Sequence, residues 1–386
     1  MPMIKNEDAK NSVVIIGAGV AGCIAALALC DSYKVTLIDK SASPEERIGE
    51  CLAPAARRIL KQLNLLTEFE SRLETDIALP HHLPNAGMQI SWGQEALHIA
   101  DNLNNPDGFG WRLDRKRFEL FLREKAQQRG VECIWPAKLI NSQYKENSWH
   151  ITLINSDLNE DQEVSIVCPF VIDATGRQAH FAKKYTDRQQ SDRLISCWAT
   201  LDDNSENKLG NIHSTNNGWW YSAPLPNQRR VLAFQTDSDL MPKGLHRDPA
   251  YFIKYAQQHS SLAKLLNDNQ KTLNLQGIVS ANSTRLNNFS GQQWAALGDA
   301  AISFDPLSSQ GIFNAMANAM QLALLLKKSN ILKIIDNDIQ QHFNKIYQQQ
   351  IEQIWRHYLH HQHFFYNQEQ RWSKMPFWQR RLQYKA

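Results

Sequence analysis

The sequence predicts an α/β fold: a parallel-sheet domain, an inserted sheet-rich domain and a helical C-terminal segment. Three observations lead to this prediction. A β-branched run at residues 13–16 enters a glycine-rich turn and then an Ala/Leu-rich helix at 24–30. A strand followed by a turn recurs at residues 170–176 and 294–298. Between these two units, residues 190–280 alternate short apolar strands with Asn-rich turns, which indicates a second sheet.

The first turn has the pattern Gly-x-Gly-x-x-Gly at Gly17, Gly19 and Gly22. In a Rossmann-type unit, Gly17 permits the tight turn, Gly19 lets the backbone approach a pyrophosphate, and Gly22 lets the helix pack on the strand. The helix start at Val20 and Ala21 offers N–H groups and a positive dipole end to phosphates. The alternative is a glycine-rich turn without a ligand, but the matched strand and helix favour a dinucleotide site.

A second strand at residues 34–38 ends in Asp39, 20 residues after Gly19. A carboxylate at this position accepts hydrogen bonds from ribose hydroxyls, so we predict that Asp39 contacts the ligand. The following residue, Lys40, is included in the same predicted site.

Two further candidates lie close to predicted helix starts. An apolar stripe predicts a helix over residues 55–66, and Glu50 lies in the loop before it. This loop either lies against a bound cofactor or is a plain connector. Asp114 is placed to cap a helix at 118–129. Arg115, at that helix start, is a candidate for a phosphate or ribose contact, with a surface arginine as the alternative.

The later strand–turn units complete the predicted cofactor site. The turn after the strand at 170–173 contains a glycine, and the strand from 294 ends in Gly-Asp. A Pro/Ser/Gly loop then enters a helix at 312–328, whose first N–H groups would stabilise negative charge on a cofactor. The predicted contacts in these turns are Gly176, Gly298, Asp299, Pro306, Gly311 and Ile312.

The inserted domain carries the candidate substrate pocket. Trp219, Trp220 and Tyr221 are consecutive and would line a pocket for an aromatic substrate. The alternative is a buried strand with one tryptophan on each face. His81 and His82 are also consecutive, but neighbouring side chains on a strand point to opposite faces. We therefore expect no metal site there. A helix is expected over residues 249–266.

The composition is that of an ordinary globular protein, with 42% hydrophobic and 21% charged residues and a net charge of +3. This charge gives no electrostatic footprint for nucleic acid or an anionic membrane. The uncharged stretch 13–30 is assigned to the strand, turn and helix, not to a membrane span. The first 12 residues do not resemble a signal peptide. The six cysteines show no Cys-x-x-Cys spacing, so we expect a cytoplasmic protein with reduced thiols.

The C-terminal segment is expected to be helical and rich in aromatic residues. After Glu369 it contains five basic and no acidic residues. Because nothing else in the chain indicates nucleic-acid binding, we expect this segment to dock on a protein partner or on the chain's own core.

Three separated motifs together resemble the FAD-dependent monooxygenases of the p-hydroxybenzoate hydroxylase fold, which include the flavin-dependent halogenases. These motifs are Gly17-x-Gly19-x-x-Gly22 with Asp39, Asp173-Ala-Thr-Gly176, and Gly298-Asp299 with Pro306 and Gly311. The helix start Arg115-x-x-Phe118 fits the same group. The resemblance implies a bound FAD. No second Gly-x-Gly-x-x-Gly occurs, so a separate NAD(P)H domain is absent and the reducing electrons come from an external donor.

The same resemblance implies a division into domains. The FAD-binding domain is assigned to residues 1–75, 110–190 and 281–330, the substrate domain to 76–109 and 191–280, and the C-terminal helical segment to 331–386.

A narrower resemblance involves shorter motifs. Residues 48–56, 218–224 and 234–237, together with 377–381 in the tail, look like the LodB/GoxB-type flavoproteins, which are often labelled tryptophan-halogenase-like. In that family the flavoprotein matures a partner amino-acid oxidase by oxygenating a tryptophan that becomes cysteine tryptophylquinone. The resemblance thus implies that the partner is the precursor of such an oxidase.

The sequence departs from true halogenases in two ways. Their Trp-x-Trp-x-Ile-Pro motif is replaced by Trp-Trp-Tyr-Ser-Ala-Pro at residues 219–224. Halogenases also use a lysine to capture hypohalous acid, and the only lysine between Ser41 and Arg115 is Lys61, in the middle of a predicted helix. Both departures argue against halogenation.

The resemblance therefore implies an FAD-dependent monooxygenase that hydroxylates a tryptophan of a partner precursor with O₂ and an external electron donor. Indole is electron-rich, so no strong base is required, and Glu50 is the candidate acid or base. The alternatives are a small-molecule aromatic hydroxylase, a flavin-dependent halogenase and an FAD-containing maturation chaperone.

Overall fold

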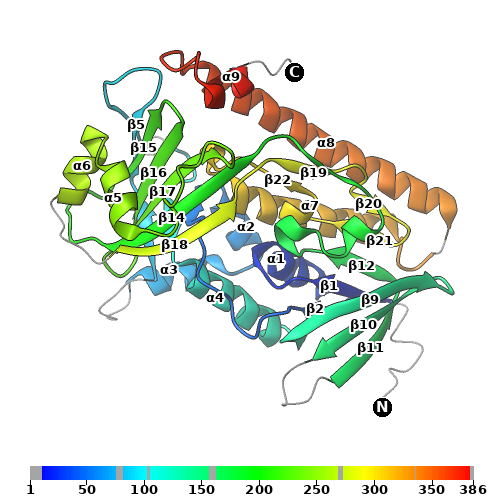
Figure 1. The fold of residues 1–386 in the computed structure, drawn as a ribbon. Helices are drawn as coiled ribbons and strands as arrows, with labels where there is room; N and C mark the ends of the chain where they lie inside the picture. Colours follow the sequence, from blue (N-terminus) through cyan, green and yellow to red (C-terminus); the bar gives the residue numbers. More distant parts are fainter. Residues whose placement is uncertain are drawn as a thin grey trace.

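The computed structural model describes residues 11–74, 81–101, 105–155, 162–267, 273–334 and 336–382. Its centre is a six-stranded sheet with the order β20-β21-β12-β1-β2-β8 (Figure 1). The strands are β1 (Ser12–Ile16), β2 (Lys34–Ile38), β8 (Glu132–Ile134), β12 (Phe170–Asp173), β20 (Ser290–Gly291) and β21 (Trp294–Ala296). Strand β1 pairs in parallel with β2 and β12, and β12 pairs in parallel with β21. These four strands therefore end at the same edge of the sheet.

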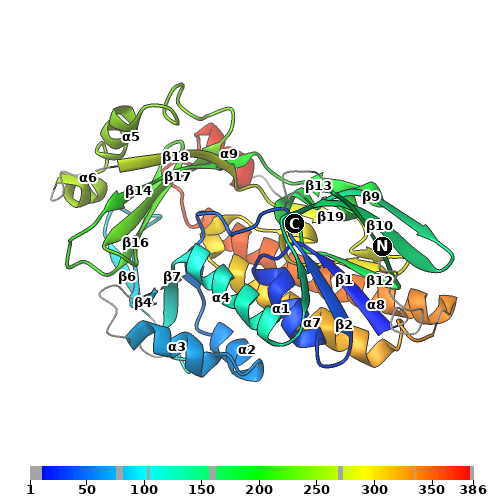
Figure 2. The same ribbon diagram turned by 90° about the horizontal axis from the view of Figure 1, so that it is seen from below.

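The central sheet is covered on both faces, as buried parallel strands require. Helices α1 (Val20–Leu29), α4 (Arg115–Gln128) and α7 (Gly311–Ser329) lie on one side, and the antiparallel sheet of β9 (Ala137–Lys145), β10 (Ser148–Asn155) and β11 (Gln162–Cys168) lies on the other (Figure 2). Every residue of α1 except Ala21 is buried. Its small, apolar side chains allow α1 to pack between the sheet and α7.

A second, seven-stranded sheet has the order β18-β14-β17-β16-β15-β5-β6. Its strands are β5 (Gly87–Ser91), β6 (His98–Asp101), β14 (Leu194–Asp202), β15 (Gly210–Thr215), β16 (Gly218–Leu225), β17 (Arg229–Asp237) and β18 (Leu273–Ser280). Helices α5 (Pro249–Ala256) and α6 (Ser260–Asn267) pack on one face, which we call the outer face, over Trp220 and Phe234. These segments lie within the ranges assigned to a substrate domain, but the division into domains remains a prediction.

The remaining elements connect the two large sheets. They are β3 (Cys51–Leu52), β4 (His82–Asn85), β7 (Gly110–Leu113), β13 (Arg188–Gln190), β19 (Thr284–Leu286), β22 (Ile302–Ser303), α2 (Ala56–Gln62) and α3 (Leu66–Glu74). Strands β3, β7 and β4 form one three-stranded sheet, and β13, β19 and β22 form another. All six cysteines are free thiols.

Two predicted helices are each divided in the structure. The helix expected over residues 55–66 is wrong as a single element, because Asn64 adopts the left-handed conformation (φ 52°) between α2 and α3. The helical segment expected over 249–266 is present, and it consists of two helices. A turn at residues 257–259 separates α5 from α6 and lets both place apolar side chains, such as Phe252 and Leu262, on the same core.

The C-terminal segment docks on the chain's own core. Helix α8 (Asn337–Asn367) runs from the central sheet to the seven-stranded sheet and is followed by α9 (Pro376–Leu382) (Figure 1). Glu369 is fully buried, and hydrogen bonds from Arg371, Ser214 and the Gly93 N–H outweigh the effect of burial and lower its pKa. The basic residues Arg371, Arg380 and Arg381 are paired with acidic residues of this chain. No helix in the described part of the chain is long and apolar enough to cross a membrane.

We expect Trp378→Ala to lower the free energy of unfolding by about 3–5 kcal/mol, because a large buried side chain is lost and a cavity remains. Trp378 is 0% exposed, packs edge-on against Trp92 and Tyr366, and donates from Nε1 to the Thr215 carbonyl at 2.8 Å. Urea denaturation followed by circular dichroism measures the effect. Trp372→Ala is the matched control, since Trp372 is only partly buried. Equal losses for the two variants would contradict specific docking at Trp378.

Candidate active site

Four turns meet at the carboxyl edge of the central sheet. Gly17 follows β1 and donates its N–H to the Ile38 carbonyl at 2.7 Å. The Ala18 N–H donates to the Asp39 carboxylate, also at 2.7 Å. The Leu297 N–H donates to the Asp173 carbonyl at 2.9 Å, which joins the ends of β21 and β12. In open α/β sheets, ligands bind in the crevice at this edge.

The three glycines of the first turn have different surroundings. A Cβ on Gly22 would lie 1.9 Å from the Gly17 carbonyl oxygen, and one on Gly17 (φ +108°) would lie 2.3 Å from the Ala174 oxygen. The fold itself therefore requires both glycines. Among the described residues, a Cβ on Gly19 would meet only Arg47 Nη2, at 3.9 Å, so Gly19 faces open space in this part of the chain. Helix α1 begins at this position without a side-chain cap, which leaves its N–H groups available to a phosphate.

Asp39 is held beside the glycine turn by a residue that the sequence analysis did not identify. Arg123 of α4 lies 3.2 Å from the Asp39 carboxylate and donates to the carbonyls of Ala18 and Ser41, both at 3.0 Å. It is only 5% exposed. Arg123 could have been identified from the sequence, because it is a basic residue on the buried face of an amphipathic helix. Lys40, in contrast, is exposed.

The turn after β12 is organised by a buried carboxylate. Asp173 accepts hydrogen bonds from the N–H groups of Thr175, Phe181 and Ala182, and burial raises its pKa. Gly176 (φ +68°) follows with open space around its Cα. Arg177, which the sequence analysis did not identify, lies 3.6 Å from Asp299 and so joins this turn to the one after β21.

The fourth turn and the start of α7 complete this edge. Gly298 donates its N–H to Asn318 Oδ1 at 2.8 Å, and a Cβ on Gly298 would lie 3.0 Å from the Ala21 Cβ. The turn is therefore packed against the start of α1. Asp305, before Pro306, is 1% exposed, and burial raises its pKa. Helix α7 begins without a side-chain cap, and its first residues are the predicted contacts Gly311 and Ile312.

Two arginines hold the loop before β3 next to the carboxyl edge of the central sheet. Arg115 donates from Nη1 to the Gly49 carbonyl at 2.5 Å and from Nη2 to Glu119 at 2.7 Å. Arg47 pairs with the same Glu119, which is fully buried. The Arg115 Nε is buried and has no hydrogen-bond partner among the described residues. The uncapped helix starts, the open space at Gly19 and these cationic groups fit an anionic dinucleotide such as FAD.

Glu50 is part of a buried network between the loop and the seven-stranded sheet. It is 4% exposed and accepts a hydrogen bond from the Tyr221 hydroxyl. Arg112 donates to the same hydroxyl at 2.6 Å and lies 3.6 Å from the Glu50 carboxylate. Burial raises the pKa of Tyr221 well above its ordinary value. The carboxylate of Glu50 is therefore fixed by one phenol and one guanidinium.

The three aromatic residues of the predicted pocket are divided between the two faces of β16. Trp220 packs on the outer face against Phe234. Trp219 and Tyr221 lie on the opposite face, which we call the inner face, and Trp219 donates from Nε1 to the Tyr366 hydroxyl at 3.2 Å. Side chains alternate along a strand, so consecutive residues do not line one pocket. The structure therefore brings only Trp219 and Tyr221 to the face that contacts the loop before β3.

When the chain is compared with known proteins, one family matches almost its whole length. The family model described as tryptophan halogenase matches residues 12–79 and 88–385. The putative FAD-dependent oxidoreductase LodB of Marinomonas mediterranea is 26% identical over 381 residues, which cover 97% of each chain.

Two solved structures are similar in fold. The flavin-dependent halogenase CmlS has a TM-score of 0.81 and 21% identity, with 97% of this chain and 68% of that one covered. The peptidyl tryptophan dihydroxylase QhpG, described as essential for tryptophylquinone cofactor biogenesis, has a TM-score of 0.75 and 23% identity, with 96% and 78% covered. These likenesses confirm the α/β flavoprotein fold predicted from the sequence.

Proposed function

Since this chain belongs to the tryptophan halogenase family of FAD-dependent enzymes, we propose that it is a monooxygenase that hydroxylates a tryptophan of a partner polypeptide. The partner would be the precursor of an amino-acid oxidase that carries cysteine tryptophylquinone. The observation that carries this proposal is the match to LodB along 97% of both chains. The likeness in fold to a peptidyl tryptophan dihydroxylase supports it.

A second observation favours hydroxylation over halogenation. The only lysine between Ser41 and Arg115 is Lys61, which lies exposed on α2. An exposed ammonium group is solvated by water and is not placed to hold a reactive halogen species in a dry site. This position of Lys61 supports a hydroxylase over a halogenase.

The residues of the carboxyl edge would bind and orient the cofactor. The N–H groups of α1 at Gly19 would hold the pyrophosphate. Asp39 and Arg115 would bind the ribose and phosphate groups, and Asp299 would bind the ribitol chain. The first N–H groups of α7, at Gly311, would stabilise negative charge on the cofactor. When bound and reduced by an external donor, FAD supplies the activation of O₂.

A residue of this chain would accept the proton that the reaction releases. Hydroxylation replaces a ring hydrogen, so a proton leaves the substrate carbon as the aromatic ring is restored. We propose that the Glu50 carboxylate accepts this proton. Tyr221 and Arg112 fix the carboxylate in place, and Arg115 donates a hydrogen bond to the same loop. The buried surroundings of this carboxylate exclude bulk water from the step.

Co-expression of this protein with a candidate oxidase precursor tests the proposal. Peptide mass spectrometry is expected to find added oxygen on one precursor tryptophan, and the oxygen should be ¹⁸O when the cells grow under ¹⁸O₂. Chlorine or bromine on the tryptophan, or turnover of free tryptophan with an unchanged precursor, would contradict it. An FAD-free variant that still matured the precursor would favour a chaperone role instead.

A further inference from the structure

Three buried polar atoms on the inner face of the seven-stranded sheet have no hydrogen-bond partner among the residues that the structure describes. They are Ser196 Oγ, Trp198 Nε1 and Gln235 Oε1, on residues that are 2%, 5% and 2% exposed. Ser196 lies opposite Gln235 in the β14–β17 ladder, and Trp198 is two residues along on the same face. A buried polar group without a hydrogen bond destabilises the folded protein, so three such groups together need an explanation. We call these three residues the polar row.

The polar row lies between two loops of the proposed cofactor site, the loop before β3 and the loop before α7. On one side, Tyr221 pairs across the ladder with Ala233, the partner of Trp198, and its hydroxyl donates to Glu50. On the other side, Trp219 pairs with Gln235 and bonds to Tyr366, whose hydroxyl donates to Asp305 at 2.7 Å. The polar row is therefore flanked by the loop containing Glu50 and the loop that enters α7.

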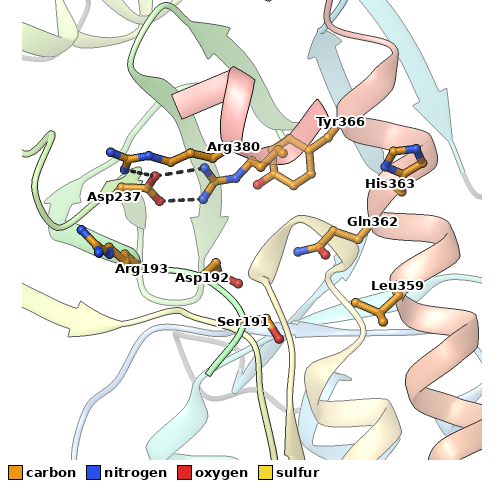
Figure 3. Close-up of a pocket in the computed structure, with 10 residues that line it drawn as sticks. Ser191, Asp192, Arg193, Asp237, Leu359, Gln362, His363, Tyr366 and Arg380 are labelled. Carbon is orange, nitrogen blue, oxygen red and sulfur yellow. Dashed lines mark hydrogen bonds and ion pairs between the residues drawn. The ribbon is translucent and has the colours of Figure 1, made fainter. Parts of the chain in front are cut away.

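A cavity of about 340 Å³ lies beyond the Gln235 end of the polar row, and its listed wall contains none of the three residues of the row. Its wall includes Asp237, two residues beyond Gln235 on β17, and Tyr366 and Gln362 of α8 (Figure 3). Its volume is within the range of about 300–1,000 Å³ that is typical of small-molecule sites. Asp237 is already neutralised by Arg380 and Arg381, with contacts of 2.8 Å.

We infer that this cavity and the polar row beyond its Asp237 wall form the binding site for the substrate tryptophan; this rests on the proposed function. Gln235 Oε1 accepts a hydrogen bond from the indole N–H, while Trp198 Nε1 and Ser196 Oγ donate to a main-chain carbonyl of the polypeptide. Trp219 and Tyr221 supply aromatic surface for the ring. The polar row is closed to solvent, so binding includes a side-chain rearrangement at the inner end of the cavity.

The chemistry of the polar row favours a tryptophan within a polypeptide over the free amino acid. The polar row offers one acceptor, one donor and one hydroxyl, and none of these groups is charged. A peptide-linked tryptophan presents a neutral N–H and a neutral carbonyl, which match them. Free tryptophan would bring an ammonium and a carboxylate group, for which the polar row offers no charged partner, and burying a charge unpaired is costly.

Binding of two peptides to the FAD-loaded protein tests the site. The probes are acetyl-Gly-Trp-Gly-amide and the same peptide with 1-methyltryptophan, which lacks the indole N–H. By calorimetry we expect the parent protein to bind the methylated probe about tenfold more weakly. Gln235→Met should bind the tryptophan probe about tenfold more weakly than the parent does, and it should lose no further affinity for the methylated probe.

Thr236→Val is the matched control on the next position of β17. Thr236 lies on the outer face, and its hydroxyl donates to the Asn217 carbonyl at 2.5 Å. This variant should unfold at lower temperature and bind both probes as the parent does. Gln235→Met should keep or raise the unfolding temperature, because it removes an unpaired buried oxygen.

The inference is overturned if the parent binds neither probe up to their solubility limits, or if Gln235→Met discriminates between the probes as the parent does. These are binding measurements, so they fail independently of the oxygenation experiment. Oxygen on the precursor with an unaffected Gln235→Met variant would refute the site alone. Probe binding through Gln235 without any oxygenated product would refute the proposed reaction alone.

Discussion

Gly19→Val is expected to weaken FAD binding at least about a hundredfold while the protein remains folded. The valine side chain would occupy the open space in front of α1, where we place the pyrophosphate. Hydrogen bonds to charged groups contribute about 1.5–3 kcal/mol each, so the loss of two corresponds to a hundredfold or more. The FAD content of the purified protein and its titration with FAD measure the effect.

Gly22→Ala is the contrasting variant for this prediction. Its Cβ would lie 1.9 Å from the Gly17 carbonyl oxygen, so the packing of α1 on β1 has to change. We expect loss of folded protein for Gly22→Ala and folded, FAD-free protein for Gly19→Val. A folded Gly19→Val protein that binds FAD as tightly as the parent would show that the pyrophosphate lies elsewhere.

Glu50→Ala is expected to lower the free energy of unfolding by about 3–5 kcal/mol. Arg112 is 1% exposed, and removal of its carboxylate partner leaves a guanidinium charge buried without compensation. Urea denaturation of the FAD-free protein isolates this structural effect from any role in the reaction. Glu50→Gln keeps an acceptor for the Tyr221 hydroxyl, so it should lose less stability than Glu50→Ala.

Glu46→Ala is the matched control in the same loop. Glu46 pairs with Arg229 at the surface, where the two side chains are 45% and 31% exposed. Exposed pairs contribute roughly 0–1 kcal/mol, so this variant should be nearly as stable as the parent. A similar loss for Glu46→Ala and Glu50→Ala would mean that the loop as a whole, and not the buried network, is the source of stability.

The local units of the fold could be predicted because their causes are local. The β-branched run before Gly17 and the Ala-rich helix after it are properties of consecutive residues. The cap formed by Asp114 on the Arg117 N–H is likewise decided within four residues. The division between α2 and α3 was not predicted, because an apolar stripe continues through Asn64 even though that residue adopts a left-handed conformation.

Part of the candidate site could not be predicted because its residues are far apart in sequence. Arg123 lies more than 80 residues after Asp39, and Arg177 more than 100 residues before Asp299. Neither pair belongs to a short motif. Glu119, which holds Arg47 and Arg115 together, reads in the sequence as an ordinary acidic residue of a helix.

The α/β class, the glycine turn, Asp39 and the repeated strand–turn units could all be predicted from the residues alone, since each depends on residue type and local spacing. Three features needed the folded chain: the face of β16 that each tryptophan occupies, the contacts of Glu50 with Tyr221 and Arg112, and the packing of the C-terminal helices on the seven-stranded sheet. Burial and ion pairing depend on the packing of distant segments, and one residue's type does not specify its neighbours in space.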